Sequence, residues 1–223
     1  ENTVMTQKEY KELFDESDPV GWDAIDNKLK QVYGNTKPRH YAPTLHFAAG
    51  GEDALDVTSI YDSQKQETHF HLVSYGMSEL YYNEEAAGGE FSNWGFEFTM
   101  RLKPFHEDDG DPLWAINLMN NLARYVYKSG KWFEEYHVIP ANGPIRLKSE
   151  ADIDIVGVAF VLDPELGKID SPHGEVSFLQ MVGLTSAEME RILSADNGHE
   201  KLKEVLSEIK AVNPLMITDL LRR

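Results

Sequence analysis

Alternating hydrophobic and polar residues predict a set of half-buried β-strands. The clearest lies at Trp94–Leu102, where every second side chain is large and apolar and the residues between them are polar. Its predicted core face consists of Phe96, Phe98, Met100 and Leu102, and its opposite face of Glu97, Thr99 and Arg101. The other predicted strands are Pro43–Ala48, Leu55–Asp62, Thr68–Tyr75, Ile153–Leu162 and Glu175–Val182.

The spacing of these segments predicts part of the sheet order. Leu55–Asp62 and Thr68–Tyr75 are joined by a short polar turn, so we expect an antiparallel hairpin. The segment Ile153–Leu162 is apolar on both faces from Ile155 onward, which indicates a strand near the middle of the sheet. The terminal Leu215–Leu221 is predicted to be a short strand or an extended tail.

Apolar residues at helical spacing predict the helices. The segment Thr6–Tyr33 should form two short helices, because Asp18-Pro19 interrupts it, and Gly34 should end the second. Three further helices are predicted: from Asp111-Pro112 to Gly130 with Asp111 as N-cap, from a capping box of Thr185 and Glu188, and over Glu200–Val212. Helices and strands come in blocks, so we predict an α+β fold with a mostly antiparallel sheet.

Composition narrows the function. The chain has 223 residues, 41% of them hydrophobic, and we expect a single domain spanning residues 1–223. With 21 basic and 38 acidic side chains its net charge is −17, which disfavours nucleic acid and favours either a basic partner or solubility alone. The absence of cysteine, of a basic-then-apolar N-terminus and of any apolar run near the roughly 20 residues of a membrane span predicts a soluble cytoplasmic protein.

The loop after the strand Thr68–Tyr75 is the predicted partner-binding site. Gly76 ends the strand, and a polar, aromatic and acidic turn follows. Loops held by a rigid sheet carry recognition in many proteins, and tyrosine offers a large contact area with a polar tip. The candidate contacts are Ser74, Tyr75, Met77, Ser78, Glu79 and Tyr81. The alternative is a polar loop whose tyrosines lie partly in the core.

Histidines provide the other candidate chemistry. His69 and His71 lie on the same face of one strand, and a metal-dependent enzyme could use them together with His173. Further ligands would have to come from distant residues such as His40, His46 or Asp62; otherwise the pair is solvated or hydrogen-bonded. The chain has no Gly-x-Ser-x-Gly elbow and no phosphate-binding glycine loop. We therefore expect a non-enzymatic protein without a cofactor.

Several blocks of sequence resemble the Suppressor of fused family. They run in the family's order from about residue 20 to 220 and include HFHLVSYGMSELY from His69, GFEFTMRL from Gly95, LARYV from Leu122 and VSFLQMVG from Val176. The shorter blocks GGEDALD, DPELG and LMITD, which begin at Gly50, Asp163 and Leu215, also match. The resemblance implies a single α+β domain similar to the N-terminal domain of the animal members.

The resemblance also implies a function in protein binding. Animal members are cytoplasmic negative regulators of Hedgehog signalling that clasp a peptide of a zinc-finger transcription factor between two domains. Because the present sequence corresponds to the first domain alone, we do not expect that two-sided clasp. The family's peptide-contacting loop matches Ser74 to Tyr81, with Tyr75 at an aromatic position and Glu79 at an acidic one.

Compact chains of this size resemble bacterial single-domain members, which are proposed immunity proteins that neutralise toxins. The acidic net charge suits a basic toxin domain as partner. A regulatory domain within a larger complex or a homodimer is the remaining alternative. Neither the partner nor the free edge of the sheet follows from the residues.

Overall fold

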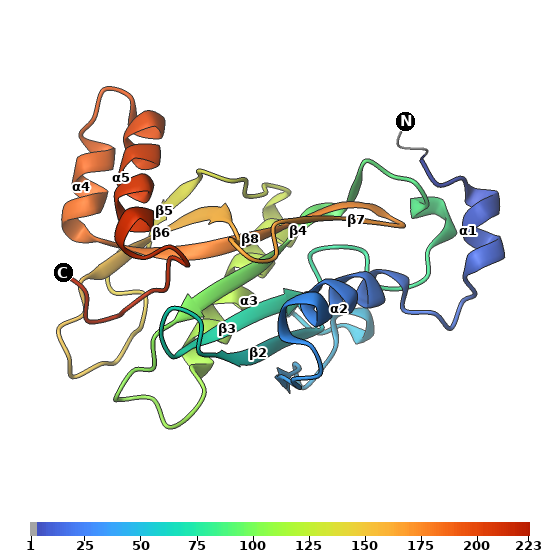
Figure 1. Cartoon of the computed structure of the whole chain (residues 1–223), viewed down its shortest axis with the longest axis horizontal. Helices are drawn as coiled ribbons and strands as arrows, with labels where there is room; N and C mark the ends of the chain where they lie inside the picture. The colour runs from blue at the N-terminus through green and yellow to red at the C-terminus, as the bar shows by residue number, and fades with distance from the viewer. Residues whose placement is uncertain (1–3) are drawn as a thin grey trace.

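One eight-stranded sheet organises the protein. The computed structural model describes residues 4–223 (Figure 1). The strand order is β1-β2-β3-β4-β8-β6-β5, with β7 paired to β8, and each pair is antiparallel except β4–β8. The strands are β1 (Arg39–Tyr41), β2 (Val57–Ser63), β3 (His69–Tyr75), β4 (Phe91–Leu102), β5 (Val138–Pro140), β6 (Ile155–Leu162), β7 (Lys168–Ser171) and β8 (Gly174–Thr185). The predicted α+β class is confirmed.

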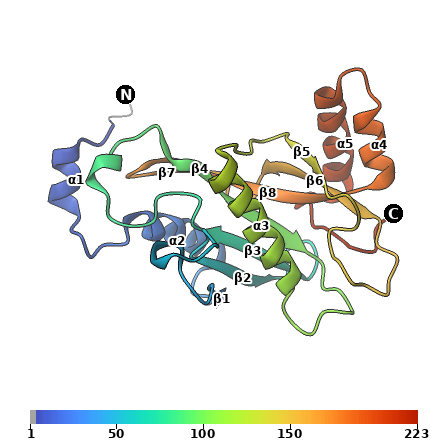
Figure 2. The same cartoon turned by 180° about the vertical axis from the view of Figure 1, so that it is seen from behind.

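Helices cover both faces of the sheet (Figures 1 and 2). Helix α3 packs on one face, where it forms the main core with the apolar sides of β4 and β6. Helix α2 and the pair α4–α5 cover separate parts of the other face. The helices are α1 (Gln7–Leu13), α2 (Val20–Tyr33), α3 (Leu113–Ser129), α4 (Ser186–Leu193) and α5 (Gly198–Val212), with 3-10 turns η1 (Phe47–Ala49) and η2 (Glu84–Ala86). Among the described residues, no helix has the length and apolarity needed to cross a membrane.

Local sequence signals for several elements are confirmed. Strands β2 and β3 form the expected hairpin, with Ser63 opposite His69. Helices α1 and α2 are separate, and Gly34 ends α2. The Thr185–Glu188 capping box is formed in both directions. These features depend on neighbouring residues, which explains why the sequence reveals them.

Two strand predictions are wrong. Pro43–Ala48 is not a strand: the edge strand β1 precedes it, and the η1 turn occupies its end. Proline lacks the N–H that a central strand donates, so the short apolar run does not pair. The strand β6 lies next to the edge strand β5 and not in the middle; it is apolar on both sides because α4–α5 cover one face and the main core the other.

The predicted cap of α3 is also wrong. The Asp111 side chain does not cap the helix but accepts hydrogen bonds from Arg39 Nε at 2.8 Å and Tyr41 Oη at 2.5 Å. It thereby ties the start of α3 to the edge strand β1. At the C-terminus, the predicted strand or tail is an extended segment whose Thr218 forms a single parallel bridge to Leu102.

Burial of the second face of β4 sets up the candidate site. Glu97, Thr99 and Arg101 are fully buried although they point away from the main core. Ionised groups inside a protein need partners, because their desolvation is costly. The structure supplies these partners from β3, from the β6–β7 connection and from β8.

Candidate protein-binding surfaces

The loop that follows β3 is built around the Glu97 carboxylate. Its two oxygens accept bonds from the backbone N–H groups of Gly76, Met77 and Ser78 at 3.0–3.1 Å. The hydroxyls of Ser74 and Ser78 donate to the same carboxylate at 2.9 and 2.5 Å. Burial raises the pKa of the Glu97 carboxyl, and these donors act in the opposite direction. The turn is therefore held from inside by an acidic side chain of the neighbouring strand.

Other elements fix the next part of the loop. Gly21 and Trp22, in the first turn of α2, both donate their N–H groups to the Leu80 carbonyl, at 2.9 and 3.0 Å. The Glu79 N–H donates to Ser92 Oγ at 2.9 Å, and the His173 Nδ1–H donates to the Glu79 carbonyl at 3.0 Å. The loop is thus a fixed platform and not a free segment.

The structure divides the predicted contact residues into two groups. Four of them have buried side chains: Ser74, Tyr75, Met77 and Ser78. The expectation that these side chains stay free for a partner is wrong, because they fill the core or bind Glu97. Tyr75 stacks on Trp22 with ring centroids 4.4 Å apart and donates its hydroxyl to Asp26. Glu79 is half-buried and Tyr81 is 53% exposed, so these two can touch a partner.

His69 and His71 belong to a buried hydrogen-bond network. Arg101 only donates, so its bond to His69 Nε2 at 3.0 Å requires a neutral ring with the proton on Nδ1, which donates to the Glu67 carbonyl. Likewise His71 donates Nε2–H to Asp163 at 2.7 Å and accepts from the Tyr33 hydroxyl at 2.5 Å. Burial lowers the pKa of both histidines. All four ring nitrogens are therefore in use.

Asp163 is the second buried carboxylate. It accepts from His71, Thr99 and Arg101 and from the backbone N–H groups of Glu165 and Leu166. Burial opposes ionisation, but His71, Arg101 and the N–H donors hold the pKa of Asp163 well below its usual range. The ionised Asp163 is therefore fully hydrogen-bonded within the protein and has no lone pair free for a metal.

The three histidines do not form a common site. His173 lies in the β7–β8 turn, where it accepts from the Tyr10 hydroxyl at 2.7 Å and donates to Glu79. His40 is hydrogen-bonded to the Ser59 hydroxyl, and Asp62 accepts a hydrogen bond from Arg39. Among residues 4–223, no three histidine or carboxylate side chains come close enough to hold a metal ion.

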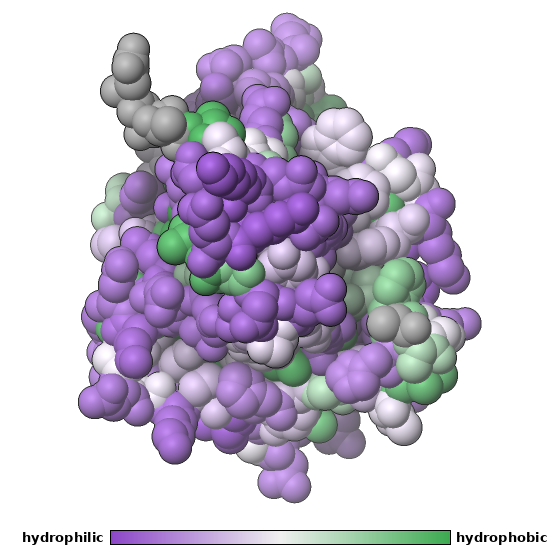
Figure 3. Space-filling view, turned by 90° about the vertical axis from the view of Figure 1, so that its right-hand side faces the viewer, coloured by the Kyte–Doolittle hydropathy of each residue, from purple (hydrophilic) through white to green (hydrophobic). Residues whose placement is uncertain are grey.

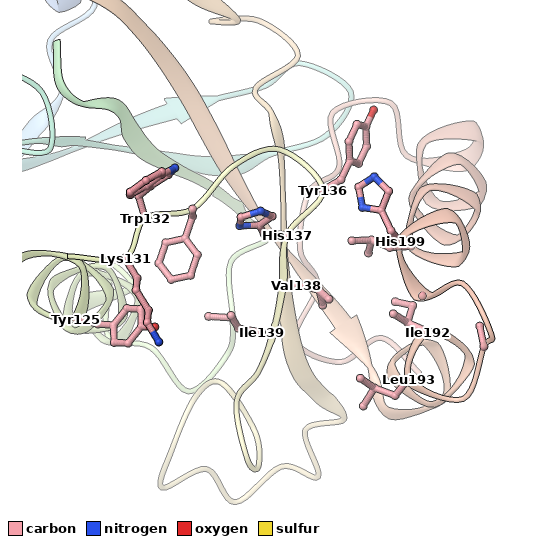
Figure 4. Close-up of a pocket in the computed structure, with 14 residues that line it drawn as sticks. Tyr125, Lys131, Trp132, Tyr136, His137, Val138, Ile139, Ile192, Leu193 and His199 are labelled. Carbon is pink, nitrogen blue, oxygen red and sulfur yellow. The ribbon is translucent and has the colours of Figure 1, made fainter. Parts of the chain in front are cut away.

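A concave surface lies on both sides of the segment Lys131–Tyr136. One pocket of about 640 Å³ lies between this segment and α4–α5 (Figure 4). A second pocket of about 800 Å³ lies between the same segment and strands β4 and β8. We call the two together the aromatic groove, because its lining includes Phe91, Trp94, Tyr125, Trp132, Phe133 and Tyr136. Trp132 and Phe91 are 54% and 53% exposed.

A strand edge adjoins the groove. Val138 and Ile139 of β5 line its first pocket, and β5 is the last strand of the described sheet on this side. Exposed strand edges can pair with a segment of a partner, whose side chains then enter neighbouring pockets. The groove and the edge together can therefore bind an extended peptide.

Sequence reasoning missed both Glu97 and the groove. In the sequence Glu97 belongs to the polar face of a strand, and the one signal it offers is its place between Phe96 and Phe98. The segment around Trp132 showed no clear periodicity, although three aromatic residues within five positions could have marked it. Both depend on chain segments that are far apart in sequence.

Comparison with known proteins identifies the family. A family model described as Suppressor of fused protein matches residues 51–223. The human Suppressor of fused homolog is 30% identical over 212 residues, which are 91% of this chain and 43% of that protein. The chain thus spans less than half the length of this curated relative.

Solved structures of Suppressor of fused proteins have a similar fold. A chain in the Sufu–Fu complex has a TM-score of 0.79 and 27% identity, with 92% of this chain and 91% of that chain covered. Drosophila Suppressor of fused also has a TM-score of 0.79, with 28% identity and coverage of 94% and 52%. One of these relatives is therefore seen in complex with a protein partner. From the family match and these likenesses, this chain belongs to the Suppressor of fused family.

Proposed function

We propose that this chain is a non-enzymatic protein-binding module that takes an extended segment of its partner into the aromatic groove. The observation that carries the proposal is the exposed aromatic lining of the groove next to the free edge of β5. Exposed tryptophan and tyrosine are the side chains that most often dominate protein interfaces. A relative solved in the Sufu–Fu complex supports protein binding in general.

The buried polar groups support a binding role over a catalytic one. Glu97, Asp163 and the nitrogens of His69 and His71 each have hydrogen-bond partners within the protein. A general acid or base must reach a substrate, and these groups are shielded from solvent. We accordingly infer no catalytic residue, metal or cofactor.

A comparative capture experiment tests the groove. The native protein, Trp132→Ala and Phe47→Ala are used as baits in lysate of the source cells, and retained proteins are quantified by mass spectrometry. Phe47 is 45% exposed, against 54% for Trp132, and lies outside the groove lining, so it serves as the matched control. We expect Trp132→Ala to retain at least about tenfold less of the specific partner than the native protein does, as for a hot-spot residue. Equal capture by the native protein and Trp132→Ala would refute the groove as the binding site.

The loop is tested in the same assay. Replacing Tyr75 would disturb the core, so the informative variant is Glu79→Ala/Tyr81→Ala, which alters the two accessible side chains. Loss of the partner from this variant together with retention by Trp132→Ala would place the contact on the loop. Melting temperatures of all baits establish that each is folded.

The partner class is a narrower proposal. We infer a basic protein, and within that class a toxin domain neutralised by this chain as a cytoplasmic immunity protein. The net charge of −17 supports a basic partner. Co-expression with a basic toxin domain encoded beside this chain should restore growth, and Trp132→Ala should not. Growth arrest with the native protein present would exclude that toxin as the partner.

A further inference from the structure

The connection between β5 and β6 contains an asparagine followed by a glycine. Asn142 and Gly143 come directly after the edge strand β5 and Ala141. Strands β5 and β6 lie in the half of the molecule that carries the C-terminus (Figure 1), away from the largely hydrophilic end face at α1 (Figure 3). The sequence has one other such pair, Asn197-Gly198. Because the reacting residues of the two pairs are identical, a difference in their chemistry has to come from the structure.

An asparagine followed by glycine can lose its side-chain amide without an enzyme. The backbone nitrogen of the glycine, after giving its proton to solvent, attacks the side-chain Cγ of the asparagine, and the amide nitrogen leaves as ammonia. Water then opens the five-membered succinimide ring at either carbonyl, which gives aspartate or isoaspartate. The reaction consumes one water, releases one ammonia and adds one negative charge. Glycine favours the attack, because it has no Cβ to hinder the nitrogen.

The β5–β6 turn leaves both reacting groups of its pair accessible. Asn142 is exposed, and its side chain forms no hydrogen bond within residues 4–223. In the same part of the chain, the Gly143 N–H donates to no acceptor. A Cβ added to Gly143 would meet no atom within 4 Å, so the space around this residue is open. The side chain of Asn142 can therefore turn toward the glycine nitrogen without breaking a contact.

The turn itself explains why this pair of residues is present. Asn142 and Gly143 have φ values of +56° and +137°, which asparagine and glycine adopt more readily than other residues. On either side, the chain is fixed to β6: the Ala141 N–H donates to the Val156 carbonyl at 2.8 Å, and the Ile145 N–H donates to the Ile155 carbonyl at 2.9 Å. The reactive pair is thus the exposed tip of an otherwise anchored turn.

The second pair is held out of reaction by a helix. Asn197 is the N-cap of α5, and its side-chain oxygen accepts a hydrogen bond from the Glu200 N–H at 3.1 Å. Its carbonyl also accepts from the Lys201 N–H at 3.0 Å, and Gly198 is the first residue of the helix. Attack on the side chain would require Asn197 to give up the cap, which stabilises the helix.

We propose that Asn142 is a site of spontaneous deamidation in the folded protein, and that the helix cap protects Asn197. The isoaspartate product adds one methylene to the main chain between the two hydrogen bonds to β6. Both products place a new negative charge beside the edge of β5. The proposal does not depend on the aromatic groove.

Ageing of the full chain, followed by peptide mapping, tests the site. The folded protein and the same protein in concentrated guanidinium chloride are incubated at mildly alkaline pH. Trypsin then releases Trp132–Arg146, which contains Asn142, and Ile192–Lys201, which contains Asn197. Deamidation raises the mass of a peptide by about 1 Da, and chromatography separates its aspartate and isoaspartate forms.

The two states of the chain separate the effect of sequence from that of structure. In the folded protein we expect Asn142 to react at least about tenfold faster than Asn197, because a cap that fixes the side chain prevents the attack geometry. In the unfolded chain the two sites should react at comparable rates, since the cap is absent. Asn142→Gly, which tolerates the positive φ, should abolish the change in Trp132–Arg146 and leave the reaction of Asn197 as it is.

Two results would overturn the proposal. One is a rate at Asn142 in the folded protein that is no faster than the rate at Asn197. The other is a rate at Asn142 that falls by more than about tenfold on folding, because the turn would then hold the side chain away from the glycine nitrogen. Circular dichroism before and after incubation establishes that the folded sample stays folded.

Discussion

Individual buried charges in this protein are matched by donors that the chain itself supplies. Glu97 receives three backbone N–H groups and two hydroxyls, and Asp163 receives donors from three side chains and two backbone N–H groups. Breaking such a set leaves several polar groups unpaired at once. These residues therefore affect stability more than their surface counterparts.

Glu97→Gln should destabilise the protein by about 3 kcal/mol, because the amide turns a donor toward backbone N–H groups that need an acceptor. That corresponds to a melting temperature lower by about 6–12 °C. Urea denaturation measures it. The exposed Glu190→Gln should remain within about 0.5 kcal/mol of the native protein. Similar effects of the two variants would show that the Glu97 bonds contribute little.

Acid should destabilise the protein through its neutral histidines. Burial lowers the pKa of His69, His71 and His173, so the unfolded chain binds more protons below its histidine pKa of about 6.5. Their stabilisation is complete above that pH and is lost as the pH falls toward the lowered pKa values. The raised pKa of Glu97 acts in the opposite sense.

A comparison of variants isolates the histidine contribution. Free energies of unfolding between pH 8 and 5.5 should fall less steeply in His71→Gln than in the native protein. The exposed His106→Gln should keep the native slope. Parallel curves for the native protein and His71→Gln would show that His71 does not titrate differently on folding.

At the scale of elements, the contact between the start of α2 and the loop after β3 holds that loop in place. The two N–H groups at the start of α2 reach Leu80, because Gly21 lets the backbones approach. A Cβ at Gly21 would lie 1.8 Å from the Glu79 carbonyl oxygen. The glycine is required by this contact between elements and not by the helix.

Gly21→Ala should therefore destabilise the protein, although alanine in a helix is usually more stable than glycine. Alanine in a helix normally stabilises by up to about 1 kcal/mol over glycine. Here we expect a loss of at least about 2 kcal/mol, because either α2 or the loop must move. Chemical denaturation gives the value, with the exposed Asn27→Ala in the same helix as a control that should be neutral or slightly stabilising. A stabilised Gly21→Ala would contradict the close contact.

For the whole molecule, net charge governs encounters with a partner. A net charge of −17 attracts basic proteins. At 0.1 M ionic strength, salt largely screens this attraction beyond about 10 Å. The specific contacts instead decide how long a complex lasts. In the proposed binding mode, the net charge therefore acts on association and the groove on dissociation.

The association rate with the captured partner should fall by about tenfold or more between 50 and 500 mM NaCl. The dissociation rate should change little with salt but rise in Trp132→Ala, because that side chain contributes short-range contacts. Surface plasmon resonance separates the two rates. A salt-independent association rate would indicate that the acidic composition serves solubility alone.

Local patterns in the sequence determined the class and most elements of this protein. Hydrophobic period, capping residues and turn glycines act within a few residues, so the β2–β3 hairpin, the α4 capping box and the C-terminal ends of α2 and α3 follow from them. Pro43–Ala48 failed because a short apolar run carries no information about pairing. The blocks that resemble the Suppressor of fused family also lie in the sequence and indicate the family without the structure.

Only the tertiary structure decided which polar residues are buried and which surfaces stay open. Tyr75 and Ser78 read as exposed recognition residues, yet α2 covers Tyr75 and Glu97 takes the Ser78 donors. The aromatic groove and the hydrogen bond between Tyr10 and His173 each join segments that are distant in sequence. Burial and concavity are properties of such long-range packing, because a side chain's exposure depends on which remote segment covers it.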